Sequence, residues 1–295
     1  MKQFLNDRAP YLLVAPTVLL LLMFSIMPLF IAFFMSFTDM DLAGIANWAN
    51  IEWIGLANYI EIFKDEVFIQ ALLNTIVYVV IGVPIVIGLS LAIAMAINFG
   101  TGKVFEWFRV VFYMPSITNV VAVAVVWGFL FNPQYGLFNF LLNTIGLPDV
   151  PWLQDPFIAK LSLIMLAVWR AVGINMIIFL AALQGIPRTY YEAAALDGAS
   201  TFQQMFKITI PLLRYAIFFV TVTTLIGWIQ FFEEPLIMTE GGPLNSTTSL
   251  ALFIYNNGFQ LSNFGYAAAG SVVLFILIIT VTLIQFRLQK NENNY

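Results

Sequence analysis

Few side chains in this sequence of 295 residues could carry covalent chemistry, because it contains neither cysteine nor histidine. That composition excludes thiolate nucleophiles, disulfides, imidazole bases and the thiolate or imidazole metal ligands. The run GTGK at residues 100–103 lacks the spacing and the following hydroxyl of a nucleotide phosphate-binding loop. The ionisable groups that stand out are Arg170, inside one apolar stretch, and Glu233 and Glu234, late in another. Such groups are costly in an apolar medium and typically mark a polar pathway or an ion pair.

These groups belong to a chain whose composition is typical of membrane proteins. Hydrophobic residues make up 61% of it and charged residues only 9%, whereas soluble domains average about 25% charged. A helix needs about 20 mostly apolar residues to cross a bilayer, and six segments meet that condition. We therefore expect an all-α, polytopic membrane protein that forms a single transmembrane domain over residues 1–295. The six expected transmembrane helices are Tyr11–Phe37, Leu72–Ile97, Val110–Phe131, Phe157–Leu183, Leu212–Met238 and Tyr266–Leu288.

The charges of the connecting loops predict the orientation of these helices. The first segment is too long for the core of a signal peptide, so we expect it to remain as a span. One set of connections carries nine basic and five acidic residues, and the other carries two basic and eleven acidic residues. Because basic residues concentrate in cytoplasmic loops, both termini are expected in the cytoplasm. The net charge of −4 and the lack of a basic tract exclude nucleic acid as a partner.

Two outer connections, Thr38–Glu66 and Asn132–Pro156, are long but rich in Trp, Asn, Pro and Gly, so we expect them to be ordered. Within the first, Leu56–Phe63 is predicted to be a short amphipathic helix at the membrane surface. Pro115 and Gly173 interrupt apolar spans. Kinked helices around a cavity are one interpretation, and the general abundance of Gly and Pro in membrane helices is the other.

A polar connection at residues 186–211, on the predicted cytoplasmic side, is expected to contain two short helices. Thr189 and Glu192 have the spacing of a capping box, which would start the first helix near Tyr190. Gly198 supplies the left-handed residue that commonly ends a helix.

The second helix of this connection is predicted from the same kind of signal. Ser200 and Gln203 repeat the capping-box spacing, and the helix is expected to run to about Ile208. Pro211 would then open the fifth span, where its missing N–H costs nothing. The small alanines on the outer face of this pair of helices are consistent with a docking surface for another protein, and an interfacial hairpin that merely joins two spans is the other interpretation.

The spacing within this connection resembles the EAA motif of ABC importer permeases, EAA-x3-G-x9-I-x-L-P. The sequence has EAA at residues 192–194, Gly198 three residues later and ITIP at 208–211, so only Ile210 departs from the motif. Residues 186–211 are named the EAA loop below. Other stretches are similar to sugar-importer permeases of the MalF-like type, and the resemblance covers essentially the whole chain. These stretches are APYL at 9–12, GLANY at 55–59, FNP at 131–133 and GGP at 241–243.

The resemblance implies a type I ABC importer permease fold (MetI-like) in a prokaryotic plasma or inner membrane, surrounded by lipid. It implies three kinds of partner: a second permease subunit, an ATPase dimer and an extracellular solute-binding protein. It also implies a carbohydrate as the transported substrate. No cofactor is then expected on this chain, since ATP and Mg²⁺ would bind the partner ATPase, and the chain itself would not be catalytic.

The resemblance also assigns roles to residues at the two ends of the expected bundle. Glu192 is expected to close the helix cap, to pair with a cation of the ATPase, or both. An outer turn is expected to contact the binding protein through Gly241, Gly242 and Pro243. The residues expected to couple to the ATPase are Glu192, Ala193, Ala194, Asp197 and Gly198.

A path for a sugar needs polar groups for its hydroxyls and an aromatic plane for its apolar ring face. Arg170 lies about ten residues, roughly 15 Å, into the fourth span, and Glu233 and Glu234 lie toward the outer end of the fifth. A structural ion pair between them is one interpretation and contact with the substrate is the other. Further candidates, each of which could instead pack between helices or face lipid, are Asn175, Trp228, Gln230 and Phe231.

Two other classes of protein share some of these features. An ion-coupled secondary transporter, in which Glu233 or Glu234 titrates, would work alone in vesicles that carry an ion gradient. An intramembrane enzyme is disfavoured by the missing His and Cys and by the lack of a carboxylate pair on separate spans.

Overall fold

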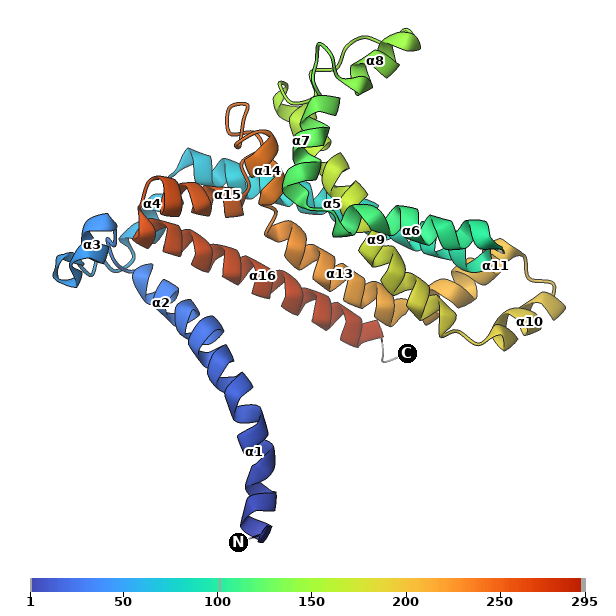
Figure 1. Ribbon diagram of the computed structural model, residues 1–295, viewed down its shortest axis with the longest axis horizontal. Helices are drawn as coiled ribbons and strands as arrows, with labels where there is room; N and C mark the ends of the chain where they lie inside the picture. Colours follow the sequence, from blue (N-terminus) through green and yellow to red (C-terminus); the bar gives the residue numbers. More distant parts are fainter. Residues whose placement is uncertain (1, 101, 293–295) are drawn as a thin grey trace. The chain divides into compact units, whose positions relative to one another are not determined.

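The computed structural model of the chain describes residues 2–100 and 102–292 (Figure 1). Within these ranges the regular structure is helical, apart from one isolated antiparallel bridge between Thr38 and Trp53. The longer helices are α1 (Lys2–Leu21), α2 (Met27–Met35), α5 (Glu66–Phe99), α6 (Lys103–Ile117), α7 (Val120–Leu130), α9 (Pro156–Gln184), α10 (Arg188–Leu196), α13 (Arg214–Ile229) and α16 (Phe264–Glu292). The shorter α-helices are α3 (Leu42–Ala46), α4 (Ala57–Ile62), α8 (Leu137–Thr144), α11 (Thr201–Gln204), α12 (Ile210–Leu212), α14 (Glu233–Met238) and α15 (Leu250–Tyr255). Single turns of other helix types are η1 (Leu22–Ile26), η2 (Trp48–Asn50), η3 (Met205–Thr209) and η4 (Asn256–Gln260).

Five of the expected spans are helices long and apolar enough to cross a membrane, which confirms an all-helical, multi-pass architecture. The third expected span differs, because α6 and α7 meet at an angle of 99° instead of forming one straight helix. Counted with this bent pair, the described residues contain up to six spans. The five are Leu13–Met35, Glu66–Phe99, Pro156–Gln184, Arg214–Met238 and Phe264–Gln289.

Local sequence explains the bend between α6 and α7. Pro115, in the last turn of α6, has no N–H to donate, so the helix is weakened there. Thr118 then adopts an extended conformation, and the side chain of Asn119 accepts from the N–H groups of Val121 and Ala122. A new helix therefore begins at Val120.

The chain divides into two compact units. One contains the residues up to Phe68 together with Phe253–Ile276, and the other contains Ile69–Leu252 together with the residues from Leu277 onward. Both α5 and α16 run through the division, so the units share helices.

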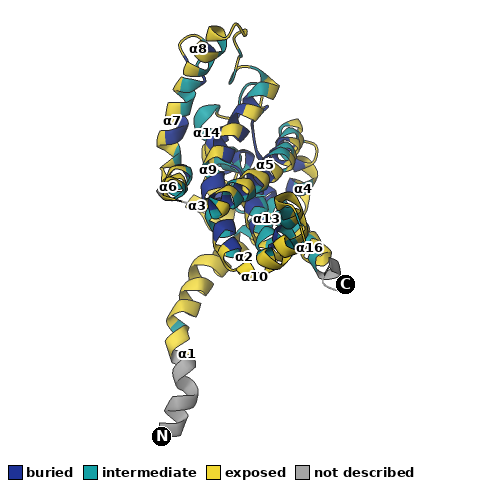
Figure 2. Cartoon of the chain, turned by 90° about the vertical axis from the view of Figure 1, so that its right-hand side faces the viewer, coloured by how far each residue is buried: buried dark blue, intermediate teal, exposed yellow. Residues whose placement is uncertain are grey.

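In the first unit, the described part of α1 is almost entirely exposed (Figure 2). The outer connection that follows α2 is ordered, as its composition predicts. Buried Asn58 donates to the carbonyls of Ser36 and Thr38 at 3.0 and 2.9 Å. Asn58 belongs to α4, which confirms the short helix predicted at Leu56–Phe63.

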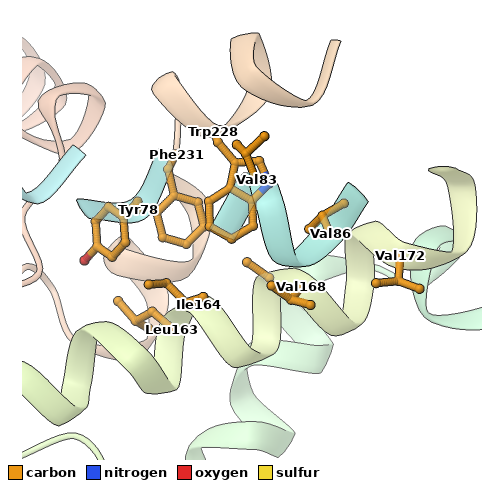
Figure 3. Close-up of a cluster of buried hydrophobic side chains, with 10 residues drawn as sticks. Tyr78, Val83, Val86, Leu163, Ile164, Val168, Val172, Trp228 and Phe231 are labelled. Atoms are coloured by element: carbon orange, nitrogen blue, oxygen red, sulfur yellow. The ribbon is translucent and has the colours of Figure 1, made fainter. Parts of the chain in front are cut away.

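The second unit has a core between α5, α9 and α13 (Figure 3). Tyr78 of α5 packs edge-on against the ring of Phe231, 4.7 Å away, and the rings of Trp228 and Phe231 stack at 5.4 Å. Aliphatic side chains of α9, including Leu163 and Val168, form the opposite wall of this cluster. α9 is the most deeply buried of the five spans, and α6 packs along it.

The second outer connection, residues 132–156, is also ordered, because one buried amide holds it together. Asn139 of α8 donates to the carbonyls of Pro133 and Val150 and accepts from the N–H of Val150 and from Nε1 of Trp152, all within 2.8–3.1 Å. The side chain of Asn139 therefore holds the segment at Pro133 and the segment at Val150 and Trp152 together.

We predict that Asn139→Ala loosens this connection, because it removes four hydrogen bonds to half-buried groups, each at a cost of about 1 kcal/mol. Limited proteolysis of the purified protein in detergent should cut residues 132–156 faster in this variant. Asn143→Ala is the matched control on the same helix, since Asn143 is exposed and its side chain bonds the exposed carboxylate of Asp149. Equal cleavage rates in the two variants would contradict the prediction.

Candidate functional site

The first half of the EAA loop is a helix with a well-defined end. α10 stops at Leu196, and Gly198 adopts the left-handed conformation with φ of 78°. The N–H of Gly198 donates to the carbonyl of Ala195, and the N–H of Ala199 donates to that of Ala194. These two bonds are the Schellman pattern, which confirms the predicted role of Gly198.

The start of α10 differs from the expectation. The capping box predicted for Thr189 and Glu192 is wrong, since the helix begins at Arg188 with Pro187 as N-cap and no side-chain cap. Pro187 already fixes the backbone for helix entry, so Thr189 falls inside the first turn, where its hydroxyl cannot cap the helix. Glu192 is exposed and closes no cap, which removes the first of its two predicted roles.

The second half of the loop follows the prediction at its start and departs from it at its end. Ser200 and Gln203 form the predicted capping box at the start of α11. The chain then continues through the π-turn η3 into α12, beyond the predicted end at Ile208. Pro211 lies in α12, and the fifth span begins as α13 only at Arg214, because α12 ends with Leu213 as its C-cap.

The surface of the EAA loop is more apolar than the sequence pattern suggests. Four of the five predicted coupling residues are exposed, and Ala194 is half-buried. Sequence reasoning missed the large apolar side chains that this surface exposes. Leu196 is 90% exposed, and the rings of Phe202 and Phe206, 4.5 Å apart, are 67% and 49% exposed. The sequence contains a signal that could have identified them, because large apolar residues in a polar connection outside the spans are unusual.

The seven residues predicted to form the substrate path lie together. All of them line one cavity of about 650 Å³, named the α9–α14 cavity here, which is walled by α9, α13, α14 and the end of α6. The seven are Arg170, Asn175, Trp228, Gln230, Phe231, Glu233 and Glu234. Sequence reasoning missed three hydroxyl residues of the same wall, Ser116, Thr223 and Thr224.

An ion pair dominates the polar side of this cavity. Nη1 of Arg170 lies 2.7 Å from Oε1 of Glu234 and 3.8 Å from Oε2 of Glu233. The side chains of Arg170 and Glu234 are 20% and 7% exposed, whereas that of Glu233 is 55% exposed. The structure thus forms the predicted pair and selects Glu234 as the close partner.

A break in the fifth span brings Glu234 to this position. α13 ends at Ile229, and α14 begins at Glu233 after Phe232 has left helical geometry. The break lies at the cavity, where polar side chains surround the freed backbone groups. Within a membrane, irregular backbone is tolerated only at such places.

The aromatic and hydroxyl groups of the cavity differ in exposure. Trp228 and Phe231 are only 5% and 6% exposed and belong to the core of Figure 3, so they form the wall behind the cavity. Thr224 is 7% exposed, and its Oγ1 has no hydrogen-bond partner among the described residues. The same holds for buried Nε of Arg170. Two polar atoms buried beside the cavity therefore have no hydrogen-bond partner among the described residues.

The turn after α14 contains the predicted contact residues Gly241, Gly242 and Pro243. Gly241 is buried, and the hydroxyls of Thr248 and Thr247 donate to the carbonyls of Gly241 and Gly242. Asn74 and Tyr78 of α5 hold the following residues through the carbonyls of Asn245, Thr247 and Thr248. The exposed tip of the turn is formed by Leu244 and Asn245.

We predict that Glu234→Gln destabilises the protein by about 3 kcal/mol, because it leaves the largely buried guanidinium of Arg170 without its close partner. Thermal unfolding of the purified protein in detergent measures the loss. Glu233→Gln is the matched control, since this neighbouring carboxylate is more exposed and farther from Arg170, and it should change the midpoint little. Replacing both partners, as Arg170→Met with Glu234→Met, should recover most of the stability. Equal midpoints for the two single variants would contradict the prediction.

Residues 85–292 match the family model described as "Binding-protein-dependent transport system inner membrane component". The chain is 36% identical over 293 residues to the probable ABC transporter permease protein YurN of Bacillus subtilis, covering 97% of both chains. It is 36% identical over 285 residues to the lactose transport system permease protein LacF of Rhizobium radiobacter, covering 95% of this chain and 93% of that one.

A solved structure shares the fold. It is a chain of a bacterial alginate ABC transporter in complex with an alginate pentasaccharide-bound periplasmic protein, with a TM-score of 0.82 and 24% identity, covering 96% of this chain and 94% of that one. The family match, the relatives and the fold agree with the EAA loop and the multi-pass architecture. The chain therefore belongs to the binding-protein-dependent ABC importers as their inner membrane permease component, a non-catalytic subunit.

Proposed function

We propose that this chain is one of two permease halves of a carbohydrate importer and that the α9–α14 cavity is its share of the sugar path. One observation carries the proposal: the EAA loop directly joins the two helices that line this cavity. α9 leads from Arg170 to the loop, and α13 leads from the loop back to Trp228 and the break before Glu234. Apart from the short break at Leu213 between α12 and α13, force applied to the loop would therefore reach both cavity walls through helix.

The chemistry of the cavity suits a sugar. It combines hydroxyl, amide and carboxylate groups with buried aromatic walls. Orientation of a polyhydroxylated ligand needs a few such donors and acceptors. The names of the lactose permease LacF and of the alginate transporter each include a carbohydrate, which supports the same class of substrate for this chain.

The partners in this proposal are a second permease, an ATPase dimer and an extracellular solute-binding protein. The charge distribution supports an orientation with both termini and the EAA loop in the cytoplasm. There the exposed Leu196 and Phe202 would enter a groove of the ATPase, and Glu192 would meet one of its cations. Closure of the ATPase dimer would then move the loop as a rigid body and switch the cavity between its outward and inward openings. The tip of the outer turn, Leu244 and Asn245, would face the binding protein.

We keep the whole chain as one transmembrane permease domain in this proposal. Its two compact units share α5 and α16, which supports a single domain. The family match removes the ion-coupled alternative, because importers of this family depend on a binding protein.

The docking role of the EAA loop predicts the effect of a charge reversal. Glu192→Lys should abolish stimulation of ATP hydrolysis by the binding protein in proteoliposomes that contain the complete transporter, because it places a cation against a cation. Membrane insertion should be unchanged, since Glu192 is exposed and makes no helix cap. Glu52→Lys, a charge reversal at an exposed site of an outer connection, is the control. Normal stimulation of ATP hydrolysis in purified Glu192→Lys complexes would contradict the docking role.

The bend at Gly198 predicts a second, steric effect. Gly198→Val forces a branched residue to a φ of 78°, which costs of the order of 1–2 kcal/mol and should misdirect α11. Gly198→Asn is the matched variant, because Asn tolerates the left-handed region. We expect stimulated ATP hydrolysis to be lost with Val and largely kept with Asn, at equal amounts of assembled complex. Equal activity in both variants would show that the bend is not needed.

A further inference from the structure

The hydroxyl of Ser116 is inserted into the backbone of α9 at the turn that carries Arg170. It donates to the carbonyl of Arg170 at 2.6 Å and accepts from the N–H of Ile174 at 3.1 Å. In a regular α-helix these two backbone groups pair with each other, since they are four residues apart. Ser116 therefore binds α9 through the backbone of the residue whose side chain forms the ion pair.

Gly173 makes this contact sterically feasible. A Cβ at Gly173 would overlap the carbonyl oxygen of Phe112 and would lie 2.6 Å from Oγ of Ser116. Only a glycine therefore lets the last turns of α6 approach the backbone of α9 this closely. Ser116 itself lies just before the bend between α6 and α7, so the C-terminal end of α6 lies against α9.

The neighbouring carbonyls of α9 are also held by side chains. Nδ2 of Asn175 donates to the carbonyl of Ala171, and Oγ of Ser90, on α5, donates to that of Val172. Together, the bonds of Ser90 and Ser116 attach one turn of α9 to both α5 and α6. The turn from Arg170 to Ile174 is thus a point at which α9 is fixed in the bundle.

We propose that Ser116 is a positioning residue of the α9–α14 cavity: its hydroxyl fixes the turn of α9 that sets where Arg170 meets Glu234. The inference rests on the proposed function in taking this cavity as the sugar path. Ser116 also lines the cavity, so it lies at the same level as the ion pair. Without the hydroxyl, the turn is free to shift along α6, and the guanidinium moves relative to its carboxylates.

The test uses the electrostatic potential inside the cavity. This chain contains no cysteine, and the cysteines of the partner subunits are replaced beforehand. Gly227 lines the cavity, and a Cβ at this position would meet no other atom within 4 Å, so Gly227→Cys supplies one thiol there. The complete transporter in nanodiscs is labelled without nucleotide or sugar by an anionic and by a cationic methanethiosulfonate, 2-sulfonatoethyl and 2-(trimethylammonio)ethyl. The ratio of the two rates reports the charge near the thiol.

In this background, Ser116→Ala should change the ratio by about threefold, because a displacement of the guanidinium by roughly 1 Å changes the potential at the thiol with opposite effect on the two reagents. Ser116→Thr, which keeps the hydroxyl, should restore the parent ratio. Thr118→Ala is the matched control, since Thr118 is two residues away and its hydroxyl bonds within α6, to the carbonyl of Met114. If Ser116→Ala does not assemble, Gly173→Ala separates the same contact and should shift the ratio instead.

A second background separates positioning from general packing. When Arg170→Met and Glu234→Met remove the ion pair, Ser116→Ala should no longer change the ratio. An unchanged ratio in the parent background, or an equal change without the ion pair, would overturn the inference. The proposed function fails by a different result, namely identical labelling rates of the parent before and after trapping with ATP and vanadate.

Discussion

A guanidinium inside a membrane-spanning helix must have an anionic partner, and the second unit is arranged around that requirement. Arg170 lies in α9, the most buried span, where an unpaired charge would cost several kcal/mol. Glu234 provides the partner at 2.7 Å, and it reaches this position because the fifth span is broken between α13 and α14. The break in the fifth span is therefore what allows the ion pair to form.

The broken helices follow from the same rule applied to the backbone. Lipid offers no hydrogen-bond partners, so every interrupted helix must turn its free N–H and C=O groups toward protein or toward a polar cavity. The break after Ile229 lies at the α9–α14 cavity, and the bend after Ile117 follows Ser116, whose hydroxyl bonds α9. Both interruptions thus concentrate polar groups at one level of the bundle.

In the proposed mechanism, transmission of force from the EAA loop to the cavity depends on the stiffness of the loop. The loop is compact because Gly198 ends α10 in a Schellman motif and the hydroxyls of Tyr191 and Thr209 lie 3.0 Å apart. A compact loop joined to two long helices moves as a lever, whereas a flexible one would absorb the motion. Its exposed apolar side chains, Leu196 and Phe202, are the part of this surface that a partner would bury.

Sequence by itself determined the properties that depend on composition and on short spacing. Apolar stretches of sufficient length predicted the spans, and the capping box at Ser200 and the left-handed Gly198 were correct because helix ends are set by a few neighbouring residues. The cap at Thr189 failed because Pro187 started the helix earlier, which is a competition between two local signals. Seven residues of the cavity were predicted by type, with a pair between Arg170 and one of the two carboxylates as one interpretation, but Ser116, Thr223 and Thr224 were missed.

Tertiary structure decided which carboxylate pairs with Arg170, since Glu233 and Glu234 are adjacent and equivalent in sequence. It also decided that Trp228 and Phe231 lie in the core, and that Ser116 binds the backbone of a helix 54 residues away in sequence. These outcomes depend on how α6, α9 and α13 pack side by side. No local spacing encodes them, because each contact joins residues that only the packed bundle brings within hydrogen-bond distance.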